Sequence, residues 1–251
     1  MAENHQLPQR PRGIYLLPNL FTTLSLFSGF YAIIAATQGN FEPACVAIFI
    51  AMICDSLDGR VARLTNTQTA FGAQYDSLSD LVSFGIAPAV LSYGWALTFL
   101  GKPGWLAAFV YSAAVALRLA RFNTQLGSED KRYFQGLPCP PAAGVVAAGI
   151  WCCVDYSLPS QDFAFLVAII MVFLAGVMVS NIRYRSFKDM DLKNKVPFVT
   201  ILAVVMVIVG IAVAPPQVLF SGLFIFALLG PITTLWGLRQ KRLQRRLTKH
   251  E

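Results

Sequence analysis

Charged residues are scarce in this sequence, and histidine is almost absent. Asp, Glu, Lys and Arg make up 13% of the 251 residues, hydrophobic residues make up 56%, and the mean hydropathy is +0.58. This composition excludes a soluble globular protein and indicates a polytopic membrane protein. The two histidines, His5 and His250, lie at the chain ends. Without a histidine near its centre, the chain cannot form a Ser-His-Asp hydrolase site.

Paired cysteines, sequence repeats and a cleavable signal are also missing. The five cysteines show neither disulfide nor zinc-site spacing and lie mostly in apolar runs, so we interpret them as packing residues. No internal repeat is visible, which argues against the duplicated architecture of many transporters. No signal-peptide pattern precedes the first apolar run, and we expect that run to remain as a membrane span.

Apolar runs long enough to cross a bilayer occur about eight times along the chain. The candidate spans are residues 16–37, 42–64, 72–98, 105–123, 139–156, 162–181, 196–214 and 217–237. Pro88 is expected to kink the third span. The sequence therefore predicts an all-α polytopic membrane protein with about eight transmembrane helices.

Four divisions of the chain follow from these spans. They are a polar N-terminus at 1–13, a six-helix core at 14–181, a basic loop with two additional helices at 182–237, and a basic tail at 238–251. We expect the tail to rest on anionic membrane lipids. Nothing in the sequence predicts a nucleic-acid partner.

Positive charge is confined to one side of this arrangement. All of the 20 Lys and Arg residues except Lys102 fall in the two termini or in the second-to-third, fourth-to-fifth and sixth-to-seventh connections. By the positive-inside rule, both termini and these connections face the cytoplasm, which predicts a protein of the cytoplasmic membrane.

Four carboxylates interrupt the apolar sequence where the second and third spans meet. Asp55 and Asp58 share a face of one helix, and Asp76 and Asp80 share a face of the next. If the two helices are neighbours, all four side chains converge. Bare anions cannot share a dry space, and each would cost roughly 3 kcal/mol at mid-bilayer. An all-oxygen site resolves the conflict by binding Mg²⁺ or Mn²⁺, or Ca²⁺ if it is roomy.

The predicted topology places this acidic cluster at the cytoplasmic ends of its helices. Arg118 and Arg121, at the inner end of the fourth span, and Asn19, at the inner start of the first, are expected at the same depth. Such a pocket suits a lipid with a phosphate-bearing head group. Asn19 could equally cap or hydrogen-bond the first helix.

Two other interpretations of the acids stay open from the residues alone. The acids could form a structural polar cluster, although intramembrane acids are usually functional. They could also belong to a divalent-cation transporter, but that function needs polar residues across the whole bilayer and does not explain the glycines and arginine between the acids.

The spacing of the acids also resembles the signature of a known family. It reads Asp55-x2-Asp58-Gly59-x2-Ala62-Arg63-x8-Gly72-x3-Asp76-x3-Asp80. This pattern resembles that of the CDP-alcohol phosphatidyltransferases and fixes eight residues. Residues 14–19, 79–88, 117–123 and 131–138 are similar to the phosphatidylserine synthase branch. Leu81 follows the last Asp, where phosphatidylglycerophosphate synthases typically have Lys.

The resemblance implies a metal-dependent transfer of a phosphatidyl group from CDP-diacylglycerol to L-serine, giving phosphatidylserine and CMP, by a homodimer. It implies two ions, Mg²⁺ or Mn²⁺, held by Asp55, Asp58, Asp76 and Asp80, with Asp80 as the base for the serine hydroxyl. Glycerol 3-phosphate or inositol phosphate stays open as the acceptor.

The other signature residues would then surround the nucleotide and the phosphates. Small side chains would let the nucleotide approach the backbone, and an amide and an arginine would face phosphates. These residues are Gly59, Ala62, Gly72, Asn19 and Arg63. Four basic residues are candidates for the serine carboxylate or the lipid phosphate: Arg118, Arg121, Lys131 and Arg132. The last two could equally be ordinary positive-inside charges.

Overall fold

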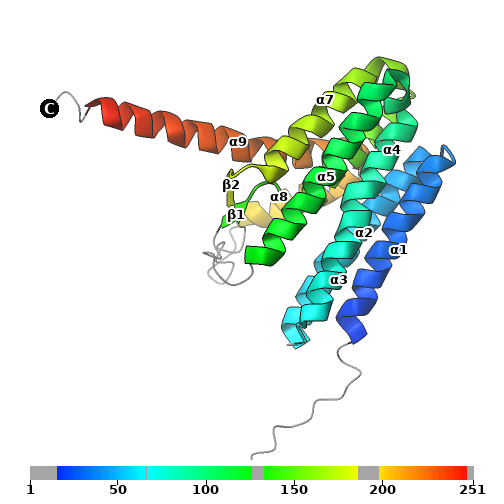
Figure 1. The fold of residues 1–251 in the computed structure, drawn as a ribbon, viewed down its shortest axis with the longest axis horizontal. Coiled ribbons are helices and arrows are strands. Elements are labelled where there is room, and N and C mark those ends of the chain that lie inside the picture. The colour runs from blue at the N-terminus through cyan, green and yellow to red at the C-terminus, as the bar shows by residue number, and fades with distance from the viewer. Residues whose placement is uncertain (1–15, 66, 126–132, 186–197, 248–251) are drawn as a thin grey trace, which may run out of the picture.

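The computed structural model describes residues 16–65, 67–125, 133–185 and 198–247, which are almost entirely helical (Figure 1). The first helices are α1 (Leu16–Thr37), α2 (Phe41–Thr65), α3 (Ala70–Asp80), a π-helical turn η2 (Leu81–Ile86), α4 (Ala87–Trp95) and the short 3-10 turn η3 (Leu97–Leu100). They are followed by α5 (Lys102–Gln125), α6 (Cys139–Asp155), α7 (Ser160–Val179), α8 (Phe198–Val213) and α9 (Pro215–Leu247). Because α3, η2 and α4 follow one another without a break, the helices correspond to the predicted spans.

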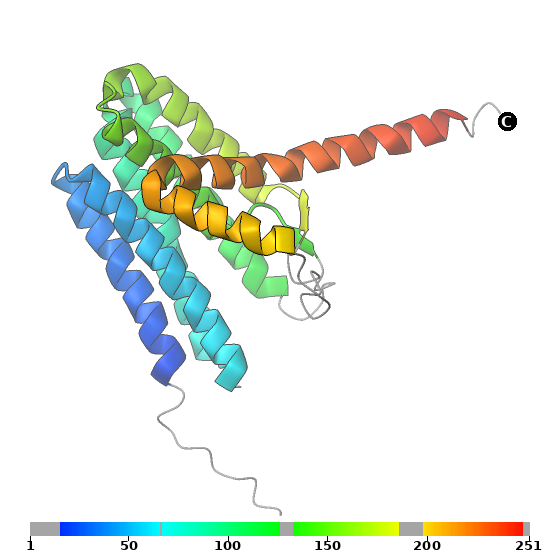
Figure 2. The same ribbon diagram turned by 180° about the vertical axis from the view of Figure 1, so that it is seen from behind.

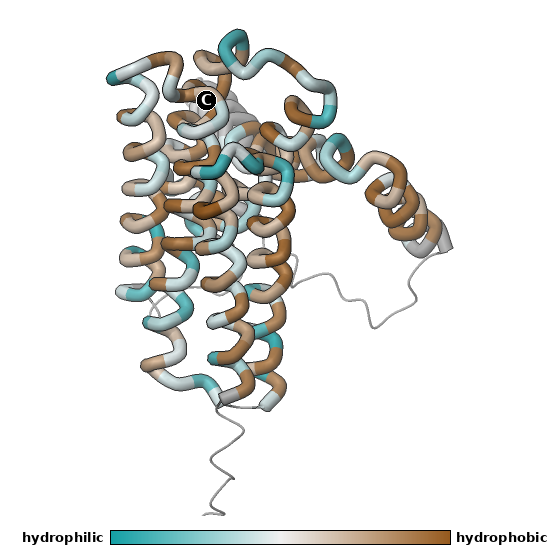
Figure 3. The backbone as a smooth tube through the Cα atoms, turned by 90° about the vertical axis from the view of Figure 1, so that its right-hand side faces the viewer, coloured by the Kyte–Doolittle hydropathy of each residue, from teal (hydrophilic) through white to brown (hydrophobic). Residues whose placement is uncertain are grey.

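Several of these helices are long and apolar enough to cross a membrane. Among the described residues they are Leu17–Thr37, Lys102–Thr124, Ser160–Val179 and Pro215–Thr234, with shorter apolar helices at Cys139–Asp155 and Leu202–Val213. Hydrophobic positions recur along the helices in Figure 3. The two remaining elements, α2 and the α3–η2–α4 rod, carry the acidic stretch. The prediction of an all-α polytopic membrane protein is confirmed.

The helices from α1 to α5, together with α7, run side by side as a bundle (Figure 1). The helix α9 crosses this bundle (Figures 1 and 2). The helix α9 packs against α6 and α8. Its C-terminal part extends beyond the other helices and continues to Leu247, ten residues past the predicted end at 237. The expected boundary between the last span and the tail therefore lies inside a continuous helix.

A two-stranded sheet lies in connections that the sequence predicted to be loops. The strands β1 (Tyr133–Gln135) and β2 (Arg183–Arg185) pair antiparallel, with Phe134 opposite Tyr184. This pairing places the fourth-to-fifth and sixth-to-seventh connections at the same end of the bundle, as an alternating series of spans requires.

Small side chains dominate the packing of α1 against α2. Six alanines of this helix pair are at most 3% exposed: Ala32, Ala35, Ala36, Ala44, Ala47 and Ala51. Side chains of this size let the backbones of two membrane helices approach closely. These alanines lie toward the turn between the two helices, and the bond from Thr22 to Asp58 shows that the pair stays in contact as far as the acids.

The π-helical turn η2 ends two residues before Pro88, where the sequence predicts a kink. Pro88 has no N–H to donate to the carbonyl of Phe84, four residues earlier. The buried hydroxyl of Tyr111, on α5, donates to that carbonyl at 3.1 Å. A neighbouring side chain thus satisfies the carbonyl freed by the proline, as membrane helices require.

Candidate active site

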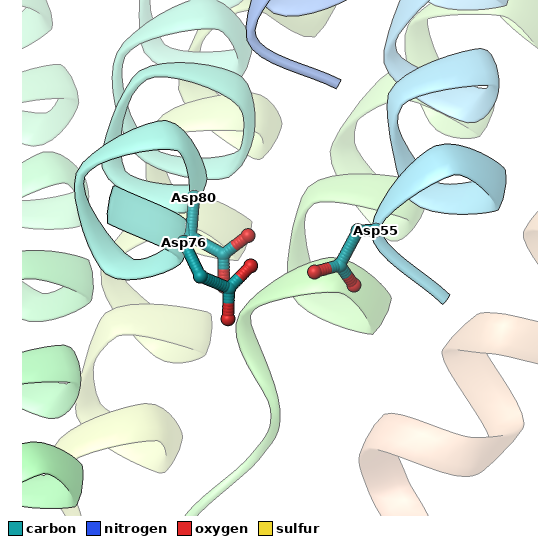
Figure 4. A group of neighbouring side chains, drawn as sticks. All are labelled: Asp55, Asp76 and Asp80. Atoms are coloured by element: carbon teal, nitrogen blue, oxygen red, sulfur yellow. The ribbon is translucent and has the colours of Figure 1, made fainter. Parts of the chain in front are cut away.

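Three of the four predicted metal-binding acids converge. One carboxylate oxygen from each of Asp55, Asp76 and Asp80 lies within 4.8 Å of one from each of the others. Asp76 and Asp80 are one turn apart on α3, and both point toward Asp55, which projects from α2 (Figure 4). All three side chains are half-buried. The sequence predicted that all four acids converge, and the structure brings these three together; their role as metal ligands stays a prediction.

The chemistry of the cluster fits a hard divalent cation. Asp76 Oδ1 and Asp80 Oδ1 are buried and have no hydrogen-bond partner. Buried polar atoms are normally paired, so two such carboxylate oxygens indicate a missing partner. Carboxylates this close also repel one another unless a positive charge lies between them. An oxygen-only donor set is suited to Mg²⁺, Mn²⁺ or Ca²⁺.

Asp58 lies beside this group of three acids and not within it. Its Oδ2 accepts a 2.7 Å hydrogen bond from Thr22 Oγ1, on α1, and the residue is 5% exposed. Helical periodicity placed Asp58 on the correct face of α2. The direction of its carboxylate, however, depends on a side chain 36 positions away.

A cavity of about 220 Å³ adjoins the acids between α1, α2 and α3. Asp58 and Asp76 form part of its wall, so the cavity is continuous with the acidic cluster. The five residues predicted to surround a nucleotide and its phosphates also line it: Asn19, Gly59, Ala62, Arg63 and Gly72. The structure brings these residues together; their roles stay predictions. A larger, mainly apolar groove of about 550 Å³ on the α1–α2 pair contains none of the four acids.

The two glycines of the signature, Gly59 and Gly72, differ in how closely other atoms approach them. A Cβ atom added at Gly59 would have nothing within 4 Å, so any side chain there would extend into free space beside the cavity. A Cβ atom at Gly72 would lie 3.1 Å from Thr69 Oγ1 and 3.5 Å from Asn19 Oδ1. The contact with Asn19 is an ordinary one, whereas the contact with Thr69 is tight, so the missing side chain at Gly72 chiefly leaves room for the Thr69 hydroxyl that caps α3.

The sequence interpretation missed a polar segment that also lines the cavity, Thr67, Gln68 and Thr69. Thr69 is the N-cap of α3, and its Oγ1 accepts a 2.9 Å hydrogen bond from the Gly72 N–H. Thr67 is 5% exposed. The signal available in the sequence was a threonine directly before a helical acidic pattern, which is a common helix start.

Arg118 and Arg121, which were predicted together, have different environments. Arg118 Nη1 contacts Cys139 Sγ at 3.1 Å, and its buried Nε has no hydrogen-bond partner. Cys139 is itself within electrostatic reach of Asp55 and Asp80. Arg118 thus lies on the α5–α6 side of the acids with a donor left free.

The guanidinium of Arg121 instead forms hydrogen bonds within the protein. It donates to the carbonyls of Val179 at 2.9 Å and Gln135 at 3.0 Å, with weaker contacts at 3.4 Å to the Met178 carbonyl and Asn181 Oδ1. These contacts join α5 to the C-terminal end of α7, whose last carbonyls have no partner within the helix. The other two predicted basic residues, Lys131 and Arg132, lie outside the described residues.

Comparison with known proteins gives a consistent picture. The sequence profile of the CDP-alcohol phosphatidyltransferase family matches residues 15–182. The chain is 38% identical over 189 residues to the CDP-diacylglycerol–serine O-phosphatidyltransferase of Helicobacter pylori, covering 75% of this chain and 79% of that protein. It is 36% identical over 170 residues to the archaetidylserine synthase of Methanothermobacter thermautotrophicus, covering 67% and 69%.

A third relative extends the match into the last two helices. The CDP-diacylglycerol–serine O-phosphatidyltransferase of Methanocaldococcus jannaschii is 33% identical over 228 residues, which cover 90% of this chain and 98% of that protein. The family profile spans all four acids, the cavity beside them and both arginines of α5. The chain belongs to the CDP-alcohol phosphatidyltransferase family.

Proposed function

We propose that this protein transfers the phosphatidyl group of CDP-diacylglycerol to the hydroxyl of L-serine, forming phosphatidylserine and releasing CMP. The observation that carries the proposal is the acidic cluster with its unpaired buried oxygens, which adjoins a cavity lined by the small residues and Arg63 of the signature. The relatives named for serine transfer support the choice of acceptor. Membership of a transferase family also favours this function over a divalent-cation transporter.

The acids would hold Mg²⁺ or Mn²⁺, and the family resemblance favours two ions. Asp55, Asp76 and Asp80 already converge, and Asp58 would join them from the cavity wall. Bound ions of this kind neutralise a diphosphate and stabilise the oxygen of the leaving CMP.

The cavity would hold the nucleotide of the lipid substrate. The free space beside Gly59 and the small side chain of Ala62 would allow close approach of the ligand to the α2 backbone. Arg63, at the exposed end of α2, would face a phosphate, with Asn19 opposite it on α1.

Asp80 is the proposed base for the acceptor. Its carboxylate would take the proton of the serine hydroxyl while that oxygen attacks the phosphorus next to diacylglycerol and the bond to the CMP oxygen breaks. The free Nε of Arg118 would bind the serine carboxylate or the phosphate of the lipid, since arginine suits planar anions.

The proposal also covers the domain organisation, the membrane location and the oligomeric state of the protein. Residues 14–181 would form the catalytic core, with the loop and helices at 182–237 and the basic tail at 238–251 as additions to it. The charge pattern favours a location in the cytoplasmic membrane with both termini and the active site facing the cytoplasm. The family resemblance favours a homodimer.

Acceptor selectivity tests the proposed function directly. Purified protein supplied with CDP-diacylglycerol should release CMP only when L-serine and Mg²⁺ or Mn²⁺ are both present, and chelation should stop the release reversibly. CMP release with glycerol 3-phosphate or inositol phosphate in place of serine would show that the acceptor is wrong although the chemistry holds. Turnover that continues after removal of divalent ions would contradict the assignment of the acids.

The two arginines of α5 should respond differently to substitution. Arg118→Ala should raise the KM for serine about tenfold or more, because a hydrogen bond to a charged group contributes about 1.5–3 kcal/mol. A larger rise in the KM for CDP-diacylglycerol would instead assign Arg118 to the lipid phosphate. Arg121→Ala should chiefly lower the thermal stability, since it leaves the Val179 and Gln135 carbonyls without this donor. Steady-state kinetics with each substrate varied, together with thermal unfolding, separates the two effects. A serine KM raised equally by Arg121→Ala would mean that Arg121 leaves its carbonyls to bind substrate.

A further inference from the structure

A connected set of buried hydroxyl groups lies between the two helices that carry the acids. Thr22 and Ser25 belong to α1, Ser79 to α3 and Ser83 to η2, and each is at most 4% exposed. We call these four residues the hydroxyl ladder. None of them belongs to the signature, and α1 itself carries none of the acids.

The hydroxyl ladder has two rungs, each of which is the set of hydrogen bonds made at one residue of α1. The first rung involves Thr22. Its Oγ1 lies 2.7 Å from Asp58 Oδ2, on α2, and 3.2 Å from the carbonyl of Pro18 in its own helix. A hydroxyl has one proton, and the shorter contact to the carboxylate is the stronger one. On the opposite side, Ser79 Oγ donates to the Thr22 carbonyl at 3.1 Å. Ser79 directly precedes Asp80 in the chain.

The second rung repeats this pattern close to one helical turn further along α1. Ser25 Oγ donates to the carbonyl of Ala51 at 3.1 Å, and Ser83 Oγ donates to the carbonyl of Ser25 at 3.0 Å. Ala51 lies one turn before Asp55 on α2. In each rung a single residue of α1, Thr22 in the first and Ser25 in the second, connects α2 to α3 or η2.

These bonds differ from the usual behaviour of hydroxyl side chains in helices. Ser92 is equally buried, yet its Oγ donates within its own helix, to the carbonyl of Pro88 at 2.8 Å. Such local bonds satisfy the hydroxyl without fixing a neighbouring helix. Those of the hydroxyl ladder cross between helices and hold them in a defined register.

A glycine on α1 extends the contact between α1 and η2. A Cβ atom added at Gly29 would lie 2.6 Å from the Cα atom of Ser83 and would also collide with its Oγ. The absence of a side chain at this position allows α1 and η2 to meet backbone against backbone. The helix α1 therefore has little freedom to slide or rotate against η2.

We infer that Thr22, supported by Ser25, Ser79 and Ser83, is a positioning residue that sets the geometry of the acidic cluster. The carboxylates of Asp55, Asp76 and Asp80 repel one another, and no hydrogen bond among them can hold α2 and α3 together while all are ionised. The hydroxyl ladder maintains the spacing of the two helices, and Thr22 also sets the direction of the Asp58 carboxylate. This inference rests on the proposed function, because it assumes that the cluster holds a divalent ion.

Direct binding of Mn²⁺ to the purified full-length protein, followed by electron paramagnetic resonance without substrates, tests the inference. Thr22→Val removes the hydroxyl but keeps the shape, whereas Thr22→Ser keeps the hydroxyl. We expect Thr22→Val to raise the half-saturating Mn²⁺ concentration about tenfold, as loss of a partner to a metal ligand typically does. Thr22→Ser should stay within about twofold of the wild type. Ser92→Ala is the matched control and should bind Mn²⁺ as the wild type does.

Equal Mn²⁺ affinity of Thr22→Val and wild type would overturn the inference, and so would an equal loss in Ser92→Ala. If Thr22→Val does not fold, Ser83→Ala decides the question: weaker Mn²⁺ binding than in Ser92→Ala supports the inference, and unchanged binding overturns it. CMP release measured on the same samples separates the two proposals. Wild-type protein that binds Mn²⁺ but releases no CMP with serine contradicts the proposed function alone. Wild-type protein that binds no Mn²⁺ overturns the inference together with the metal site.

Discussion

Asp80→Asn is expected to lower kcat about 10³-fold while leaving much of the affinity for CDP-diacylglycerol. The amide keeps the shape of the carboxylate but cannot accept the proton of the serine hydroxyl, and general-base catalysis contributes about 10²–10⁴-fold to rates. Asp80 lies one turn beyond Asp76 on α3, and its Oδ1 is buried without a partner. Single-turnover CMP release, with lipid binding measured separately, checks the expectation.

Asp55→Asn provides the comparison for this variant. Asp55 is the contribution of α2 to the group of three acids, so its loss should weaken metal and lipid binding together. If Asp80→Asn loses substrate binding as severely as Asp55→Asn, Asp80 acts mainly as a metal ligand. Substantial turnover by Asp80→Asn would rule it out as the base.

Gly59→Leu should abolish productive binding of the lipid nucleotide without unfolding the protein. The added side chain meets no protein atom within 4 Å of its Cβ position and would extend beside a cavity of about 220 Å³. We expect kcat/KM for CDP-diacylglycerol to fall at least about 10²-fold, since displacement of the reacting groups by even 1 Å can cost that much in rate. Kinetics with the lipid varied, and thermal unfolding, measure the two quantities separately.

The matched control for this prediction is Gly222→Leu on α9. Gly222 is also helical, and a Cβ atom there likewise has nothing within 4 Å, but the residue does not line the cavity. Its substitution should change neither kcat/KM nor the unfolding temperature appreciably. Normal lipid affinity in Gly59→Leu would show that the nucleotide binds elsewhere.

The parts of this structure that depend on helical periodicity were predictable from the sequence. Because residues three or four positions apart share a helix face, the convergence of Asp55, Asp76 and Asp80 followed once α2 and α3 were taken as neighbours. The number and order of the helices followed from apolar runs and from the one-sided distribution of Lys and Arg.

The features that depend on contacts between distant residues were not predictable in the same way. The carboxylate direction of Asp58 depends on Thr22, and the engagement of Arg121 depends on the end of α7. The pairing of β1 with β2 joins segments about 50 residues apart in the chain, and no local pattern indicates it. The sequence pattern could place Arg118 and Arg121 at one depth. It could not show that Arg118 has a buried donor without a partner while both terminal nitrogens of Arg121 donate to protein oxygens.

The position of the acids early in the chain has a consequence for biosynthesis. All four acids, the residues that line the cavity and both rungs of the hydroxyl ladder lie between Pro18 and Ser83. Chains emerge from the ribosome N-terminus first and their earlier parts can fold while the rest is being made. The geometry needed for ion binding can therefore assemble as soon as the third span has entered the bilayer, before α8 and α9 are translated.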